Sequence, residues 1–163
     1  VEEALTSKGY VYYDGDRDIP GKGRQHANKP DFIAVKGNKV YIGEIKPPAE
    51  GPRSGSWRQR QRSDTEEFAT VREDVARREK AGLLSPEIGG HEIIIRGQIE
   101  DYVRKIGTNF DLPAMSPPHA EIMMAYCVPE SECRNVEKAL SNCGKKVDER
   151  VDTGNGSVTY CLG

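Results

Sequence analysis

A short predicted hairpin constrains the fold of this chain more than any other segment. Two runs rich in β-branched and aromatic residues, 32–35 and 39–46, flank Gly37-Asn38. Two such runs separated by two residues, the first of them glycine, are typical of a β-hairpin with a type II′ turn. A two-residue loop fixes the register, so that Lys36 faces Lys39. The chain is therefore expected to build a sheet around this antiparallel pair.

The same register gathers polar side chains at the open end of the hairpin. Asp31 is expected opposite Glu44, and Lys46 shares the face of Glu44 because side chains alternate along a strand. Opposed carboxylates repel, so a cation has to offset their charge. Mg²⁺ in proteins takes one or two carboxylates and completes its shell with water and phosphate oxygens.

We therefore predict that Asp31, Glu44 and Lys46 are catalytic residues. Asp31 and Glu44, with the carbonyl group of Ile45, are expected to bind Mg²⁺ or Mn²⁺, and Lys46 to orient a water molecule or stabilise charge on a phosphate. The structural alternative is an exposed hairpin end with a salt bridge, worth less than about 1 kcal/mol.

Hydrophobic periodicity and capping signals predict the elements around the hairpin. Before and after it we expect a helix over 1–8, a strand over 10–13, a helix from the Ser63/Glu66 capping box to Gly82, a strand over 91–96 and a helix over 98–106. A second group of elements follows a proline-rich linker: a strand over 120–128, a helix over 130–142 and a hairpin around 153–156.

The motif at the hairpin resembles a known family signature. Pro30-Asp31, followed after 12 residues by Glu44-Ile45-Lys46, is similar to the PD-(D/E)xK signature of the restriction-endonuclease-like nuclease superfamily. The resemblance implies an α/β fold whose central mixed sheet belongs to an αβββαβ core. We expect that core to span residues 1–107, and residues 108–163 to form a C-terminal βαββ extension of the same domain.

The resemblance also implies further site residues. Many family members carry a metal-binding acid on the first helix, and Glu2, in phase with Leu5, could serve in that role; an exposed acid is the alternative. Gln98 and Tyr102 resemble the Q-x3-Y element of the RecB-like branch, in which it helps to hold the substrate. Gln98 is therefore predicted to bind nucleic acid, whereas Tyr102 is more simply a core residue.

The charge distribution is uneven along the chain. Residues 17–62 contain 11 Lys/Arg against 4 Asp/Glu, whereas residues 119–163 contain 5 against 7. A basic segment of this kind is expected of a surface that approaches phosphates, although a solvated surface has the same composition. Within it, Arg53, Trp57, Arg58 and Arg60 are predicted to contact nucleic acid, since arginine binds phosphate and tryptophan stacks on bases; Trp57 could instead pack in the core.

Together these features predict a divalent-metal-dependent endonuclease that hydrolyses phosphodiester bonds, with DNA ahead of RNA as substrate. The alternative is a non-catalytic nucleic-acid-binding module of the same fold. The apolar stretches are too short to cross a bilayer, so no membrane association is expected. The gaps between the four cysteines do not match a zinc site, and one or two disulfides remain open.

A biological role follows from a second resemblance. Val1 is not an initiator methionine, and the small size is similar to that of toxin modules excised from larger bacterial proteins, which often use this fold. Such a module would be delivered as part of a secreted protein and would act in the cytoplasm. An immunity or inhibitor protein would then be a partner.

Overall fold

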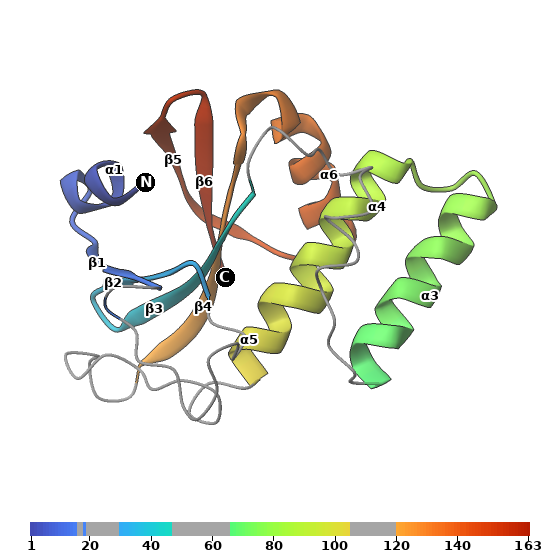
Figure 1. Cartoon of the computed structure of the whole chain (residues 1–163), viewed down its shortest axis with the longest axis horizontal. Coiled ribbons are helices and arrows are strands. Elements are labelled where there is room, and N and C mark those ends of the chain that lie inside the picture. Colours follow the sequence, from blue (N-terminus) through green and yellow to red (C-terminus); the bar gives the residue numbers. More distant parts are fainter. Residues whose placement is uncertain (16–17, 19–29, 47–65, 105–119) are drawn as a thin grey trace.

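The computed structural model describes residues 1–15, 18, 30–46, 66–104 and 120–163. The chain is an α/β fold around a mixed six-stranded sheet with strand order β1-β2-β3-β4-β6-β5 (Figure 1). The strands are β1 Val11–Asp14, β2 Phe32–Lys36, β3 Lys39–Ile45, β4 Glu121–Pro129, β5 Val147–Gly154 and β6 Ser157–Leu162. The pairing of β3 with β4 is parallel, and the other four pairings are antiparallel.

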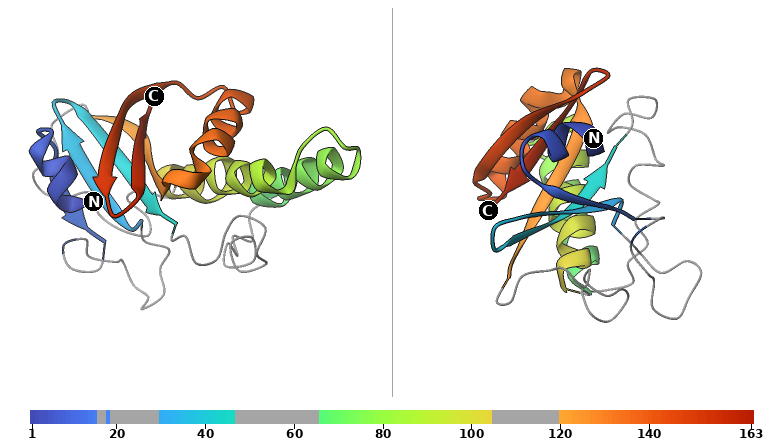
Figure 2. Two further views of the ribbon diagram at one scale, coloured as in Figure 1. Left: turned by 90° about the horizontal axis from the view of Figure 1, so that it is seen from above. Right: turned by 90° about the vertical axis from the view of Figure 1, so that its left-hand side faces the viewer.

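Helices cover both faces of this sheet. They are α1 Glu2–Ser7, α3 Glu66–Lys80, α4 Pro86–Glu92, the π-helix η1 Ile93–Ile99, α5 Glu100–Arg104, the 3-10 helix η2 Glu130–Glu132 and α6 Cys133–Asn142. Figure 2 shows α1 on one side of the sheet, and α6 with the continuous helical segment 86–104 on the other. The helix α3 lies outside that segment, and its residues Phe68, Val71 and Val75 are buried. No helix within the described ranges combines the length and apolar character needed to span a membrane.

The predicted hairpin and its register are confirmed. Lys36 pairs with Lys39, and the pairing continues to Phe32 and Gly43. Gly37 has φ +62°, the positive value that the first loop position of a type II′ turn requires. The expected C-terminal strand, helix and hairpin are also present, as β4, α6 and β5–β6.

The strand predicted over 91–96 is wrong, because this segment is helical. Ser85 caps α4 by accepting a hydrogen bond from the Ile88 N–H at 3.3 Å, and Pro86 occupies the first turn, a combination typical of a helix start. The run Ile93–Ile95 is almost wholly buried, and burial in tertiary contacts overrides the strand preference of β-branched residues. The strand parallel to β3 is β4, which lies in the segment assigned to the extension.

Side-chain alternation divides the core into two layers. Ile33, Val40 and Ile42 form one buried cluster with Tyr102 of α5. The opposite face carries a second cluster, which α1 covers with Leu5. Glu44 has the same parity as Val40 and Ile42, so it lies on the face that the helical segment 86–104 covers.

Candidate active site

Glu44 is a carboxyl group in the protein interior. Its side chain is only 3% exposed, although burying a charge is costly unless it is neutralised or paired. Burial raises the pKa of Glu44 well above its ordinary value, and a hydrogen bond to Asp31 and the charge of Asp31 raise it further. The positive charge of Lys46 acts in the opposite direction. The charges of Asp31 and Lys46 therefore act on Glu44 in opposite directions.

Asp31 lies at a bend immediately before β2 and is exposed. Regular pairing ends at Phe32 and Gly43, so Asp31 is not the in-ladder partner of Glu44 that we expected. Instead, its N–H donates to the Gly43 carbonyl at 2.9 Å, and its carboxylate accepts from the Ile45 N–H at 2.8 Å. These contacts hold the Asp31 side chain over the end of β3, within hydrogen-bonding reach of Glu44.

Lys46 directly follows β3 and is half-buried. Its N–H donates to the Cys127 carbonyl at 3.0 Å, which extends the parallel pairing with β4 beyond Ile45. The structure therefore brings Asp31, Glu44 and Lys46 together at one end of the sheet.

Tyr102 reaches the Glu44 carboxyl group from the helical segment, and Gln98 contacts Tyr102. The Tyr102 hydroxyl donates to Glu44 Oε2 at 3.4 Å, and Gln98 Nε2 donates to the Tyr102 hydroxyl at 2.8 Å. Both side chains are buried. The four-residue spacing that resembles Q-x3-Y therefore links Gln98 to Glu44 through the Tyr102 hydroxyl, so Tyr102 contacts the site as well as the core.

Tyr126 and His91 form a second buried hydrogen-bonded chain that the sequence did not indicate. Tyr126 pairs with Glu44 across β3 and β4, and its hydroxyl lies 2.8 Å from His91 Nδ1, while His91 Nε2 lies 2.8 Å from Glu132. Burial lowers the pKa of His91, which favours the neutral ring with one N–H. A carboxylate only accepts, so Nε2–H donates to Glu132 and Nδ1 accepts the Tyr126 proton. That proton therefore points away from Glu44.

The carboxyl pair fits a cation that keeps most of its water. Asp31 and Glu44 supply hard oxygen ligands, and their mutual repulsion and the buried position of Glu44 both favour a bound positive charge. Among the described residues no group of three Asp, Glu, His or Cys side chains could hold a metal ion. Mg²⁺ or Mn²⁺ with one or two protein carboxylates suits this donor set better than a metal enclosed by protein ligands.

Glu2 is not grouped with these two carboxylates. It lies at the start of α1, on an open groove of about 930 Å³ that also borders Thr153 and Gly154. Burial and Asp14 chiefly raise the pKa of Tyr12, and Glu2 and Asp31 both contribute to that shift. Gly154 pairs with Ser157, and Ser157 pairs with Pro129 beyond the end of β3, so Glu2 lies near the same end of the sheet as Asp31. The predicted nucleic-acid contacts Arg53, Trp57, Arg58 and Arg60 lie outside the described residues.

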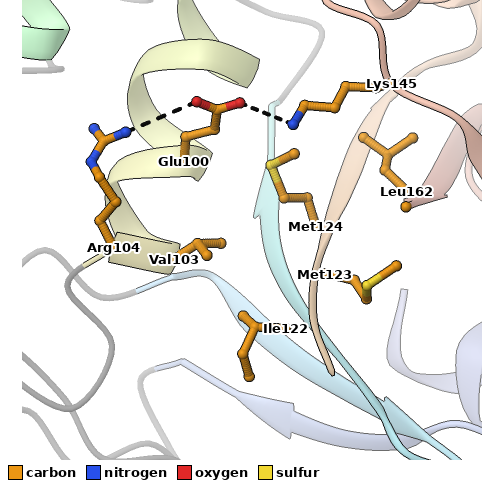
Figure 3. A pocket seen from close by; sticks show the side chains of 9 residues that line it. Glu100, Val103, Arg104, Ile122, Met123, Met124, Lys145 and Leu162 are labelled. Atoms are coloured by element: carbon orange, nitrogen blue, oxygen red, sulfur yellow. Dashed lines mark ion pairs between the residues drawn. The ribbon is translucent and has the colours of Figure 1, made fainter. Parts of the chain in front are cut away.

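A separate cavity of about 260 Å³ lies near the start of β4 (Figure 3). Its wall includes Ile122 and Met124, which pair with Val40 and Ile42 toward the turn of the β2–β3 hairpin rather than with Glu44. At its rim Glu100 forms ion pairs with Arg104 at 3.9 Å and Lys145 at 3.0 Å. The cavity is therefore not part of the carboxyl site.

Comparison with known proteins assigns no family. The sequence matches no family model, and neither a curated protein nor a solved structure is significantly similar to it.

Proposed function

We propose that this protein is a divalent-metal-dependent endonuclease of the PD-(D/E)xK class that hydrolyses phosphodiester bonds, with DNA ahead of RNA as substrate. One observation carries the proposal: the buried carboxyl group of Glu44 lies at the end of β3 where the Asp31 carboxylate accepts from the Ile45 N–H, and the charges of Asp31 and Lys46 both act on it. Two carboxylates and one cation at a sheet end are the groups that metal-assisted phosphodiester hydrolysis uses. The order of α1, β1, β2 and β3, followed by helices and the parallel β4, is similar to the core of that class.

The chain's own residues have distinct tasks in this reaction. Asp31 and Glu44 would hold the cation; once bound, Mg²⁺ or Mn²⁺ polarises the phosphate and lowers the pKa of a water molecule. The Ile45 N–H fixes the Asp31 carboxylate, and the Tyr102 hydroxyl fixes Glu44. The Lys46 ammonium group would stabilise the negative charge that develops on the phosphate as water adds and the ester bond breaks.

The biological part of the proposal concerns the protein as a toxin module of a larger bacterial protein. It would act in the cytoplasm of a target cell, and an immunity or inhibitor protein would cover the site. The support for it is the small size of the chain and its resemblance to nucleases of such systems.

The nuclease activity is tested with supercoiled plasmid, linear DNA and total RNA in Mg²⁺ or Mn²⁺, with EDTA as the metal-free control. Lys46→Ala should abolish cleavage. Lys39→Ala is the matched control, because Lys39 lies at the turn end of β3 and pairs with Asp148 at 3.3 Å. Cleavage that requires both metal and Lys46 but not Lys39 supports the proposal. Metal-independent binding of DNA without cleavage would establish the non-catalytic module instead.

A further inference from the structure

The carbonyl oxygen of Gln98 is unusual within the described part of the chain. Among the buried side-chain oxygen and nitrogen atoms of the described residues, Gln98 Oε1 is the one without a hydrogen-bond partner. The Gln98 side chain is only 8% exposed. Buried polar atoms are nearly always paired, so this acceptor next to Tyr102 is available to a further hydrogen-bond donor.

The orientation of the Gln98 amide follows from its neighbours. Tyr102 has a single hydroxyl proton, and it donates that proton to Glu44 Oε2 at 3.4 Å. Its oxygen must therefore accept from Gln98, whose Nε2 lies 2.8 Å away. The amide nitrogen faces Tyr102, and the carbonyl oxygen is left for another group.

The chemistry of an acceptor limits what that group can be. A carbonyl oxygen needs a hydrogen-bond donor, and the non-bridging oxygens of a phosphodiester carry no proton. Water donates two hydrogen bonds and is small enough for a buried site. A water molecule, not a phosphate group, is therefore the partner that suits Gln98.

We infer that Gln98 orients the water molecule that attacks the phosphodiester, an inference that rests on the proposed nuclease function. The water oxygen forms a bond to phosphorus as the bond to the leaving ester oxygen breaks. One water proton passes to the leaving oxygen, giving an alcohol, and the other goes to the product phosphate monoester. Gln98 accepts a hydrogen bond from the water molecule until the oxygen–phosphorus bond has formed. This role is narrower than the nucleic-acid contact that the Q-x3-Y resemblance implies.

The experiment separates water positioning from substrate binding. Gln98→Met removes the carbonyl group at nearly constant volume, and Val136→Ala in the buried part of α6 controls for general destabilisation. We would measure the single-turnover cleavage rate in Mg²⁺, the DNA dissociation constant in Ca²⁺, and the melting temperature with and without Mn²⁺. Gln98→Met should lower the rate about tenfold or more, with DNA affinity and the Mn²⁺-induced melting shift kept within about twofold of wild type.

Other results of this experiment would overturn the inference. A fall in DNA affinity that matches the fall in rate would make Gln98 a nucleic-acid contact and overturn the inference. An unchanged rate would make the bound water purely structural and overturn it as well. If the wild-type protein cleaves nothing in any metal, the proposed function fails first and the inference falls with it. If Gln98→Met does not fold, Gln98→Asn, which withdraws the carbonyl by one methylene, should show the same loss of rate without loss of affinity.

Discussion

Gly43 is a position next to the candidate site at which a single added methyl group should be destabilising. It lies directly opposite Phe32 in the β2–β3 pair. A Cβ atom at Gly43 would lie 2.3 Å from Phe32 Cζ and 2.4 Å from Cε1, well inside van der Waals contact. The ring has little room to move, since Phe32 is fully buried and stacks on Tyr12 with 5.2 Å between ring centroids.

The Gly43→Ala variant is therefore expected to overpack this layer. Overpacking of a core lowers the free energy of unfolding by about 1–3 kcal/mol. For a domain of this size, each kcal/mol lowers the melting temperature by about 2–4 °C, so a fall of about 2–12 °C is expected. Urea unfolding followed by tryptophan fluorescence and circular dichroism would give the free energy directly.

A double-mutant cycle tests whether the Phe32 ring is the cause. Phe32→Leu alone should cost about 1–2 kcal/mol through lost packing. In the Gly43→Ala background it should cost less, because the smaller side chain relieves the clash, giving a coupling energy above about 0.5 kcal/mol. If the two changes are additive within about 0.5 kcal/mol, the ring is not the obstacle and the reasoning is refuted.

Three further predictions concern charge and thiols. Because the pKa of Glu44 is raised in the folded protein, its contribution to stability is complete below pH 4.5, the ordinary pKa, and is lost as the pH rises through the raised pKa. In EDTA, the melting temperature of Glu44→Gln should therefore depend less on pH than that of the wild type. The same variant should no longer be stabilised by Mn²⁺. Arg78→Ala should lower the free energy of unfolding in urea by about 1.5–3 kcal/mol, because Arg78 pairs with Glu92, which is 1% exposed. The control Arg77→Ala changes a side chain that is 73% exposed and should cost less than about 1 kcal/mol. Equal costs for the two variants would contradict this reasoning. The four cysteines are free, so dithiothreitol should leave the melting temperature unchanged; burial and Glu92 raise the pKa of Cys143 to about 12, so iodoacetamide should modify the native protein slowly, and rapid alkylation at neutral pH would count against that.

The part of the site that was predictable from sequence is the part that forms locally. The two-residue loop at Gly37 sets the pairing of β2 and β3, and side-chain alternation then places Glu44 and Lys46 on one face. The expected pairing of Asp31 with Glu44 is wrong because regular pairing with β3 ends at Phe32 and the chain bends at Asp31. That bend depends on the contacts of Asp31 with the Gly43 carbonyl and the Ile45 N–H.

The parts that depend on distant contacts were not predictable in the same way. The burial of Glu44 requires the helical segment that contributes Tyr102, and nothing near Glu44 in the sequence indicates that cover. A run of isoleucines is compatible both with a strand and with a helix that is buried on several sides, which is why the strand predicted over 91–96 is wrong. The local signal for the helix is its Ser85-Pro86 start. The contact of His91 with Tyr126 comes from packing between α4 and β4, for which no local motif exists.

The parallel pairing of β3 with β4 has a consequence for how the protein folds. Two parallel strands cannot be joined by a tight turn, so β3 and β4 pair only after a long connecting segment has been closed into a loop. The entropic cost of closing that loop slows the pairing of β3 with β4. The hairpin β2–β3 can form early, but β4 brings Tyr126 alongside Glu44 only when that step is complete. We therefore expect the environment of Glu44 to be established late, so that cleavage-competent protein emerges during refolding with the slow phase rather than with the first secondary structure.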